Sequence, residues 1–395
     1  MTAALEGIKV VDLCSVVSGP VAMATLADQG ADVIKVEGLT GDVTRGARPE
    51  SLEFAPGFVA CNRGKRSIAL DLKNADGQAI LWRLLERADV VAQNYRPGVM
   101  DRLGFGYETV AARNPGIVFL SISGVGPVGP YAKKRVYDPT IQSLTGFTDI
   151  QADPITRRPK MVRTLVADKT TAIYAAQAVT AALFARTRTG RGQHLQVSML
   201  DVMMSFLWPE GMAPFAVVAE DRRDAPNTPH DMIFETSDGY VTFGTVSDKE
   251  WAGLCKALKR PELIADERFA TGAQRSANRQ VRMETVEAAI AGFSSDEIIA
   301  RLEANDVPCM KVKTRREALD DPQVIANEIV VEMDQPGVGR MRQARPAALF
   351  GDTPSRRPRP APGLGQHSRE ILTELGFENT EVAAFIDRGV VGAAS

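Results

Sequence analysis

Strand-type and helix-type patterns alternate along the first part of this chain, and this alternation limits its fold more than any other feature. Short apolar runs typical of buried strands occur at Ile8–Cys14, Asp32–Glu37, Ser67–Leu72, Asp89–Asn94 and Ile117–Ser123. Helical patterns lie between them, the first at Gly19–Gly30 with Pro20 in a first-turn position. Since a crossover helix returns the chain to the same edge of a sheet, the strands are expected to be parallel. The sequence therefore predicts an α/β fold with a doubly wound, mainly parallel sheet.

The composition is that of an ordinary globular protein and argues against several functional classes. Hydrophobic residues make up 44% and charged residues 24% of the 395 residues, so we expect a sizeable core and two domains. A net charge of −2 argues against a nucleic-acid binder. The four cysteines lack CxxC spacing and the three histidines lack metal-ligand spacing, so neither disulfides nor a metal site is expected. Because we see no signal-type N-terminus and no apolar run of about 18 residues, we expect a cytoplasmic protein with no membrane partner.

A long helix is predicted within Met161–Leu200, and one acid stands near its start. Its expected buried face consists of Ala172, Ile173, Ala176, Val179, Leu183 and Phe184. Arg186, Arg188 and Gly190 indicate where the helix ends. Asp168 precedes the apolar pattern at the place of an N-cap, so it either caps the helix or acts as a nucleophile, held as an anion by the positive helix end. Periodicity does not decide between these two interpretations.

Polar and cationic residues follow several predicted strands, at the edge where ligands of doubly wound sheets bind. These residues are Val17, Ser18, Lys73, Asn94, Tyr95, Arg96 and, one turn further on, Arg102. Three cationic side chains near successive strand ends favour a polyphosphate ligand. The segment Gly124–Gly129 matches GxGxxG, but it follows a late strand, and Pro127 and Pro130 interrupt it, so an NAD site is not expected.

The motifs of the common nucleophiles are missing from the sequence. Neither a GxSxG elbow nor a P-loop occurs, so an enzyme built from this chain would rely on a carboxylate. The candidates near strand or helix ends are Asp12, Glu37, Asp138 and Asp168.

The composition changes at residues 209–229, which are rich in proline, alanine and charge and predict a linker. Beyond the linker, two β-rich runs joined at Asp238-Gly239 predict a hairpin. Helical patterns follow near Lys249–Leu258, Val281–Ala291 and Ser295–Ala304. We therefore expect a second, smaller α+β domain.

Blocks along almost the whole chain resemble one protein family. They include VVDLCSVVSGPVAMATLADQGADVIKVE, NRGKRSIALDLK, VVAQNYRPGVMDRLGF, SGVGPVGPYA, VYDPTIQSLTG, ADKTTAIYAAQAVTAALFARTRTGRGQHLQVSMLD and PAPGLGQHSREIL. In this order they resemble the family III CoA transferases, which include formyl-CoA transferase and carnitine CoA transferase. The resemblance implies a large Rossmann-like domain from residues 1–208 and 326–395, a linker at 209–229 and a small domain at 230–325. It also implies an interlocked homodimer, with active sites between one subunit's large domain and the other's small domain.

The resemblance also implies an activity. The family's catalytic aspartate falls on Asp168, which would carry a mixed anhydride and then an aspartyl-CoA thioester while CoA moves from an acyl-CoA to a free carboxylic acid. Coenzyme A is then a substrate, and no tightly bound cofactor is expected. Asp138 is either an assisting acid or a helix-cap acid.

The CoA-binding positions that the resemblance implies lie in four short segments and one helix. They are Val17, Ser18, Leu70, Asp71, Leu72, Lys73, Asn94, Tyr95, Arg96, Arg102, Lys134, Arg135, Val136 and Tyr137. Lys73, Arg102 and Arg135 are the expected phosphate partners, and Tyr95 is expected beside the adenine or the pantetheine.

Two departures from the family pattern narrow the activity. Val17 stands where formyl-CoA transferase has a glutamine, and Arg223–Asp231 lacks that enzyme's glycine run, which argues against oxalate and formyl-CoA as the substrates. The related α-methylacyl-CoA racemases use a histidine where this chain has Tyr137, and tyrosine is a poor base at neutral pH. This argues against racemisation, so a racemase or isomerase is only the alternative enzyme. A non-catalytic CoA-thioester binding protein is the third possible function. His230 is a further residue that could reach an acyl group.

Overall fold

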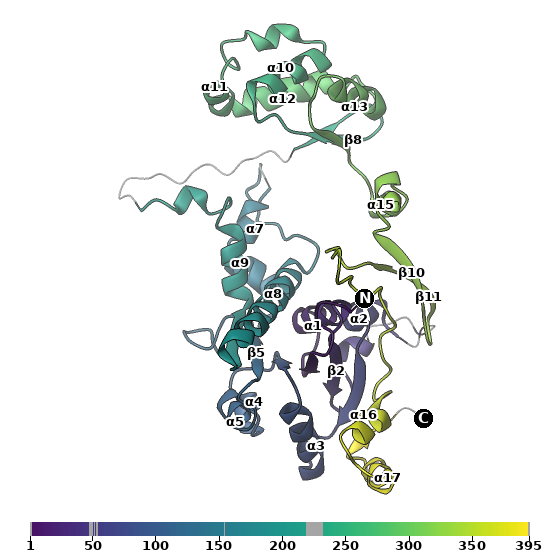
Figure 1. Cartoon of the computed structure of the whole chain (residues 1–395). Coiled ribbons are helices and arrows are strands. Elements are labelled where there is room, and N and C mark those ends of the chain that lie inside the picture. The colour runs from purple at the N-terminus through teal and green to yellow at the C-terminus, as the bar shows by residue number, and fades with distance from the viewer. Residues whose placement is uncertain are drawn as a thin grey trace. The chain divides into compact units, whose positions relative to one another are not determined.

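The computed structural model describes residues 2–46, 50, 52, 54–153, 155–218 and 232–393. The chain forms two compact units, each described by itself below (Figure 1). Unit 1 comprises Met1–Ala152, Pro159–Asp224 and Ala326–Ser395, and unit 2 comprises Asp153–Arg158 and Ala225–Ile325. Within the described ranges we find no helix that combines the length and the apolar character of a membrane span.

Unit 1 is built on a mainly parallel sheet, which confirms the predicted fold class. Its strands are β1 (Lys9–Asp12), β2 (Asp32–Glu37), β3 (Arg66–Leu70), β4 (Val90–Gln93), β5 (Val118–Ser123), β6 (Gln193–Ser198) and β12 (Val391–Gly392). Their order is β12-β3-β2-β1-β4-β5-β6, with every pair parallel except β12 with β3. The order reverses between β1 and β4, which is the kind of position where doubly wound sheets bind ligands.

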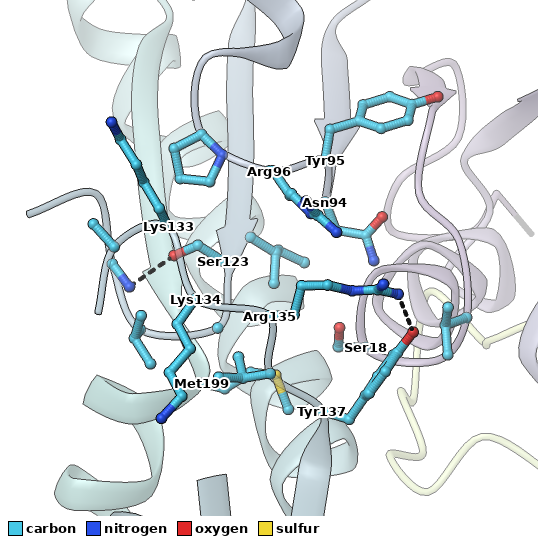
Figure 2. Close-up of a pocket in the computed structure, with 18 of the residues that line it drawn as sticks. Ser18, Asn94, Tyr95, Arg96, Ser123, Lys133, Lys134, Arg135, Tyr137 and Met199 are labelled. Carbon is cyan, nitrogen blue, oxygen red and sulfur yellow. Dashed lines mark hydrogen bonds between the residues drawn. The ribbon is translucent and has the colours of Figure 1, made fainter. Parts of the chain in front are cut away.

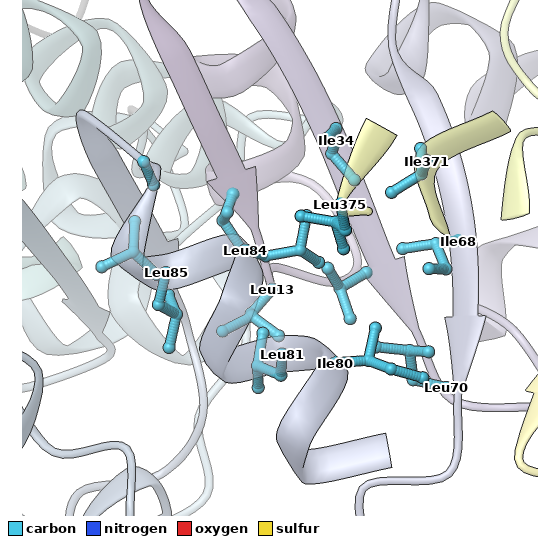
Figure 3. Packing of buried hydrophobic residues seen from close by; sticks show 14 of the residues in the cluster. Leu13, Ile34, Ile68, Leu70, Ile80, Leu81, Leu84, Leu85, Ile371 and Leu375 are labelled. Atoms are coloured by element: carbon cyan, nitrogen blue, oxygen red, sulfur yellow. The ribbon is translucent and has the colours of Figure 1, made fainter. Parts of the chain in front are cut away.

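Helices cover both faces of this sheet, as a sheet buried on both sides requires. On one face, Val10, Val118 and Leu120 pack against helices α1 (Ser18–Asp28) and α8 (Val166–Thr189). On the other face, strand residues pack against α3 (Ala75–Glu86), α16 (Ser368–Glu374) and α17 (Asn379–Asp387). Figure 3 shows this second layer, in which Ile371 and Leu375 meet Ile68 and Ile34. The last part of the chain therefore belongs to the same core as the first, and Figure 1 shows both around one sheet.

Shorter elements complete unit 1. They are η1 (Val43–Gly46), α2 (Pro56–Asn62), α4 (Val99–Arg102), α5 (Tyr107–Arg113), α6 (Asp138–Leu144), α7 (Phe147–Ile150), α9 (Met199–Leu207), η2 (Ala213–Phe215) and the antiparallel pair β10 (Val330–Gln335) and β11 (Gly339–Ala344). The glutamine Gln335 fixes this pair to the following segment, since its amide donates to the Ala361 carbonyl at 3.0 Å and accepts from the Ala361 N–H at 2.9 Å.

Unit 2 is an α+β unit with its own core. The hairpin predicted at Asp238-Gly239 is present as β7 (Ile233–Glu235) and β8 (Tyr240–Phe243), and β9 (Cys309–Lys311) pairs with β8. The helices are α10 (Asp248–Ala257), η3 (Pro261–Ile264), α11 (Gly272–Ala277), α12 (Arg279–Ile290), α13 (Ser295–Glu303), α14 (Arg315–Leu319) and, at the boundary, α15 (Pro322–Ala326). Trp251 and Phe269 are fully buried between them.

Helix α8 differs from its sequence prediction in two respects. It begins at Val166 with Leu165 as the N-cap residue, so Asp168 lies in the first turn and is not the cap. Ala172, Ala176, Val179 and Leu183 are buried as expected, but Ile173 is 69% exposed and Phe184 is 64% exposed. The prediction counted neighbours of the buried positions as part of the face, whereas one residue further along a helix lies about 100° around its axis.

Shortening one side chain in the layer shown in Figure 3 tests that packing. Leu81 is fully buried between α3 and the sheet, so Leu81→Ala should lower the free energy of unfolding by about 2–5 kcal/mol, through lost burial and the cavity left behind. Leu349→Ala is the control, because Leu349 is exposed and its loss should cost less than about 0.5 kcal/mol. Urea denaturation measures both. Equal losses would contradict the packing described here.

Candidate functional site

A cavity of about 580 Å³ lies in unit 1, at the carboxyl ends of strands β1, β4 and β5. Three loops supply its walls: the loop after β1, the loop after β4 and the loop between β5 and α6. Asp168 from the first turn of α8 and Met199 from the start of α9 complete the lining. This is the edge of the sheet that the strand pattern indicated, because parallel strands bring their carboxyl ends together.

The cavity carries an excess of positive charge. Its five cationic side chains are Arg96, Arg102, Lys133, Lys134 and Arg135. Among the residues that the structure describes, none of the five forms an ion pair with a carboxylate; Arg135 only approaches the Tyr137 hydroxyl, at 3.5 Å (Figure 2). Such a set of cations suits a ligand with several phosphates, since each phosphate needs compensating charge.

Asp168 is a mostly buried carboxyl group with hydrogen-bond donors from another helix. Ser18, at the start of α1, lines the same cavity, and hydrogen bonding from its hydroxyl and its backbone N–H lowers the pKa of Asp168. Burial raises the pKa of Asp168, the negative charge of Asp138 raises it further, and the Ser18 hydrogen bonds lower it; the result is a pKa of about 6. The sequence predicts that the helix N-terminus favours the anion, and the raised pKa contradicts this prediction. Burial and the second acid outweigh the helix end.

Asp138 is 1% exposed and caps helix α8. Its Oδ2 accepts the backbone N–H of Asp168 at 3.1 Å, and its Oδ1 accepts the Gln142 amide at 2.6 Å. Gln142 in turn accepts the N–H of Val162, in the segment before α8. A cap from another helix therefore fixes the backbone of Asp168, whose own helix lacks a side-chain cap. Whether Asp138 also assists catalysis stays a prediction.

Several predicted CoA-binding residues do come together in this cavity. Those that line it are Ser18, Asn94, Tyr95, Arg96, Arg102, Lys134, Arg135, Val136 and Tyr137. The Asn94 side chain is engaged by the protein itself, since it accepts from the N–H of Ser15 at 2.9 Å and donates to the Ser15 carbonyl at 2.8 Å. Val136 packs so closely on Gly124 that a Cβ at that glycine would lie 1.9 Å from it, which explains this glycine of the GxGxxG match.

The other predicted CoA-binding residues do not line this cavity. The Leu70 side chain is buried in the core and Leu72 packs against the same cluster, so neither presents an open apolar surface there. Asp71 accepts the N–H of Lys73 at 3.0 Å in the exposed turn after β3. Val17 lies instead in a neighbouring apolar cavity of about 840 Å³. The segment 223–231, with His230, falls outside the residues that the structure describes.

Sequence reasoning missed some of the cavity's residues. Ser15, Pro97, Lys133, Ser123 and Met199 line it without having been predicted. Lys133 stands in a run of three cations, and Ser123 ends a predicted strand, so the rule of strand ends could have found both. Within the described ranges we also find no group of three or more His, Cys, Asp or Glu side chains that could hold a metal ion.

Replacing Asp168 by asparagine should stabilise the fold at alkaline pH. In the folded chain its pKa is about 6 instead of the ordinary 3.8, so the ionised form carries a cost that is present in full above pH 6 and absent below pH 3.8. One pKa unit corresponds to about 1.4 kcal/mol, so the gain in the free energy of unfolding reaches at most about 3 kcal/mol. Urea denaturation near pH 8 and near pH 4 measures it, with the exposed Asp352→Asn as the control. An Asp168→Asn variant less stable than wild type near pH 8 would contradict the raised pKa.

Comparison with known proteins identifies the family. The family model described as CoA-transferase family III matches residues 5–368. The chain is 34% identical to the succinate–glutarate CoA-transferase of Agrobacterium fabrum, over 94% of this chain and 95% of that protein. It is 31% identical to the formyl-CoA:oxalate CoA-transferase of Streptomyces avermitilis, over 99% and 100%. Among solved structures, a CaiB/BaiF family protein from Brucella suis is 35% identical, with a TM-score of 0.81 over 95% of this chain and 100% of that one. The chain therefore belongs to CoA-transferase family III and is a CoA transferase.

Proposed function

We propose that this enzyme moves CoA from an acyl-CoA to a free carboxylic acid and that Asp168 is the nucleophile. The observation that carries the proposal is a single one: a mostly buried carboxylate beside Ser18 lines a cavity with five cationic side chains, none of which forms an ion pair with a carboxylate of the described residues. A carboxylate beside a polyphosphate site is the arrangement that covalent transfer from an acyl-CoA needs. With a pKa of about 6, most Asp168 side chains are ionised at neutral pH.

The reaction proceeds in four acyl transfers at Asp168. First, a carboxylate oxygen attacks the thioester carbonyl and CoA leaves as the thiolate, which gives a mixed anhydride. The thiolate then attacks the aspartyl carbonyl and releases the donor acid as its carboxylate, leaving an aspartyl-CoA thioester. The acceptor carboxylate attacks this thioester and forms a second mixed anhydride, from which the thiolate takes the acceptor acyl group. The aspartate is regenerated, and no proton is gained or lost.

The protein's own groups have defined roles in this scheme. Ser18 donates its N–H and hydroxyl to the oxygens of Asp168, so these donors lie where negative charge develops when the aspartyl carbonyl is attacked. Arg96, Arg102, Lys134 and Arg135 bind the phosphates of CoA. Lys73 and the neighbouring residues after β3 would bind the CoA end that extends beyond the cavity. Tyr95 flanks the adenine or the pantetheine.

Two other functions of the same scaffold are less well supported. A racemase needs a base at the position of Tyr137, and no histidine is among the described residues that line the cavity. Tyr137 is 59% exposed and its hydroxyl lies beside the Arg135 guanidinium. This position suits a residue that binds the ligand better than one that removes a proton. A non-catalytic CoA-thioester binding protein would have no need of a carboxyl group that destabilises the fold at neutral pH.

We also propose that the chain works as a homodimer in the cytoplasm, as the family resemblance implies. The exposed apolar side chains of Ile173 and Phe184 on α8 support an interface on that helix. The acids to test first are those named for the relatives, namely succinate, glutarate and oxalate. Val17, in place of the glutamine of formyl-CoA transferase, argues against oxalate.

Trapping of the intermediate tests the nucleophile directly. Wild-type protein mixed with succinyl-CoA and hydroxylamine should acquire a hydroxamate on Asp168, seen by mass spectrometry of peptides, and should transfer CoA to an added acid. Asp168→Asn should lower transfer by about 10³-fold or more, because the attacking oxygen is gone. Asp201→Asn is the matched control, since Asp201 also lies in the first turn of a helix of unit 1 but does not line the cavity. No adduct with any thioester, together with α-proton exchange in deuterated water, would replace the transferase proposal by the racemase.

The pH dependence of the reaction should follow the pKa of Asp168. Because only the ionised carboxylate attacks, kcat/KM should fall about tenfold per pH unit as the pH decreases below about 6. Initial rates between about pH 4.5 and pH 8 measure this acid limb, with protein stability checked across the range. A kcat/KM that stays nearly constant down to about pH 4.5, as the ordinary aspartate pKa of 3.8 would give, would contradict the burial of the nucleophile.

A further inference from the structure

The loop between β1 and α1 contains a strained residue. Val16 has a φ of 68°, in the left-handed region, where a β-branched side chain clashes with its own backbone. Arg157, Lys259, Asp306 and Glu328 are the other described non-glycine residues with positive φ, and none of them is β-branched. A residue stays in such a conformation only where its surroundings hold it there, and such residues gather at functional sites.

Side chains from β2, from the loop after β2 and from the loop after β4 hold this one turn. The Cys14 N–H donates to Asp12 Oδ1 at 2.9 Å, and the Cys14 carbonyl accepts from Lys35 Nζ at 2.8 Å. Asn94 bonds both the N–H and the carbonyl of Ser15. The N–H of Val16 donates to Asp42 Oδ2 at 3.2 Å. Every residue of the turn is therefore fixed through its backbone.

Lys35 and Asp42 form the centre of this arrangement. Their side chains are 0% and 1% exposed, and Nζ lies 3.1 Å from Oδ2. Burial alone lowers the pKa of Lys35, but the carboxylates of Asp12, Asp42 and Glu37 outweigh burial and raise it. Burial alone raises the pKa of Asp42, but Lys35 and Thr44 outweigh burial and lower it. Both groups are therefore charged at neutral pH. Because the desolvation of two charges offsets most of their attraction, stability alone does not account for the burial of this pair.

The strained turn leads directly into the start of α1. Val17 is the N-cap residue of that helix and has no side-chain cap. The next residue, Ser18, lines the cavity together with Asp168 and lowers the pKa of Asp168 through hydrogen bonding. The turn lies close against the helix, because a Cβ at Gly19 would lie 2.4 Å from the Cys14 side chain. Any movement of Val16 would thus displace the donors of Ser18.

We propose that Lys35 and Asp42 are positioning residues, which hold Val16 in its left-handed turn and thereby fix the Ser18 N–H and hydroxyl against the Asp168 carboxylate. This inference rests on the proposed role of Asp168 as the nucleophile. Neither residue lines the cavity, so each acts through the backbone of the turn and not through the substrate. An error of less than 1 Å in the donors would weaken their contact with a charge that develops during attack.

The variant Asp42→Asn tests whether Asp42 positions the Val16 turn. Asp42 accepts from Lys35 on Oδ2, from the N–H and hydroxyl of Thr44 on Oδ1, and from the Val16 N–H on both oxygens. An amide must therefore place its NH₂ against donors. We expect kcat to fall by about tenfold or more and the KM for acyl-CoA to change by less than about threefold. The acid limb of kcat/KM should move to higher pH, because the Ser18 hydrogen bonds that lower the pKa of Asp168 are weakened.

Asp28→Asn is the matched control. Asp28 is also a buried carboxylate in an ion pair, with Arg63, and it lies at the opposite end of the same helix, away from Asp168. Its loss should change kcat by less than about twofold and leave the acid limb in place. A folded Asp42→Asn protein with wild-type kcat and acid limb, or an equal loss of kcat in Asp28→Asn, would overturn the proposal.

A second variant tests whether Asp42 acts by holding Val16 in its left-handed conformation. Glycine adopts a φ of 68° without strain, so the turn no longer needs Asp42, and Val16→Gly/Asp42→Asn should recover at least about tenfold of the lost kcat and restore the acid limb. A double variant as slow as Asp42→Asn would show that Asp42 does not act through this turn. Should Asp42→Asn fail to fold, Lys35→Met/Asp42→Asn leaves no unpaired buried charge at this pair and is measured instead, with the same expected results. Hydroxamate trapping in wild type separates the two proposals: an adduct on Asp168 keeps the nucleophile whatever these variants do, and no adduct removes both.

Discussion

The close packing of α1 against α8 is the contact on which the rest of the site depends. The two helices meet through small side chains on the same face of the sheet, among them Ala22, Ala172, Ala175 and Ala176. Small residues let two helix backbones approach closely, which larger side chains would prevent. Since both helices begin at the edge where the strands end, this packing brings the donors of Ser18 to the carboxylate of Asp168. The start of α8 thus supplies the acid, Asp168, and the start of α1 supplies Ser18, whose hydrogen bonding acts on it.

Each of these helix starts lacks a cap of its own and is fixed by residues from elsewhere. The Asp168 N–H is bound by Asp138, and the turn before α1 is bound by Asp42, Lys35 and Asn94. Capping from other elements places the helix ends more strictly than a local N-cap can, because a local cap moves with its helix. The cost is a set of buried charges, and unit 1 accommodates them by pairing Lys35 with Asp42 and Lys65 with Asp12.

The fold could be predicted from the sequence because its strands are buried on both faces and are therefore visible as short apolar runs. The two-residue strand β12 could not, since Val391 and Gly392 carry no pattern and pair only because α16 and α17 return the chain to β3. At the site, local chemistry located Asp168 near a helix start but gave the wrong sign for its pKa. The reason is that Asp138, 30 residues away in the sequence, and burial by the surrounding loops decide that value. The left-handed conformation of Val16 could not be predicted either, because it depends on hydrogen bonds of this turn to Asp42, Lys35 and Asn94, which lie on other segments.

The raised pKa of Asp168 also suits the reaction proposed for it. A carboxylate with the ordinary pKa of 3.8 is a weak nucleophile and a good leaving group, so a mixed anhydride on it would revert readily. At a pKa of about 6 the carboxylate is more basic than the donor and acceptor acids, and it is still mostly ionised at neutral pH. Burial thus improves attack by Asp168 and makes it a poorer leaving group than the acids that it exchanges. The raised pKa thus favours the steps in which Asp168 attacks or the exchanged acid leaves, while hydrogen bonding from Ser18 lowers that pKa and so keeps Asp168 mostly ionised at pH 7.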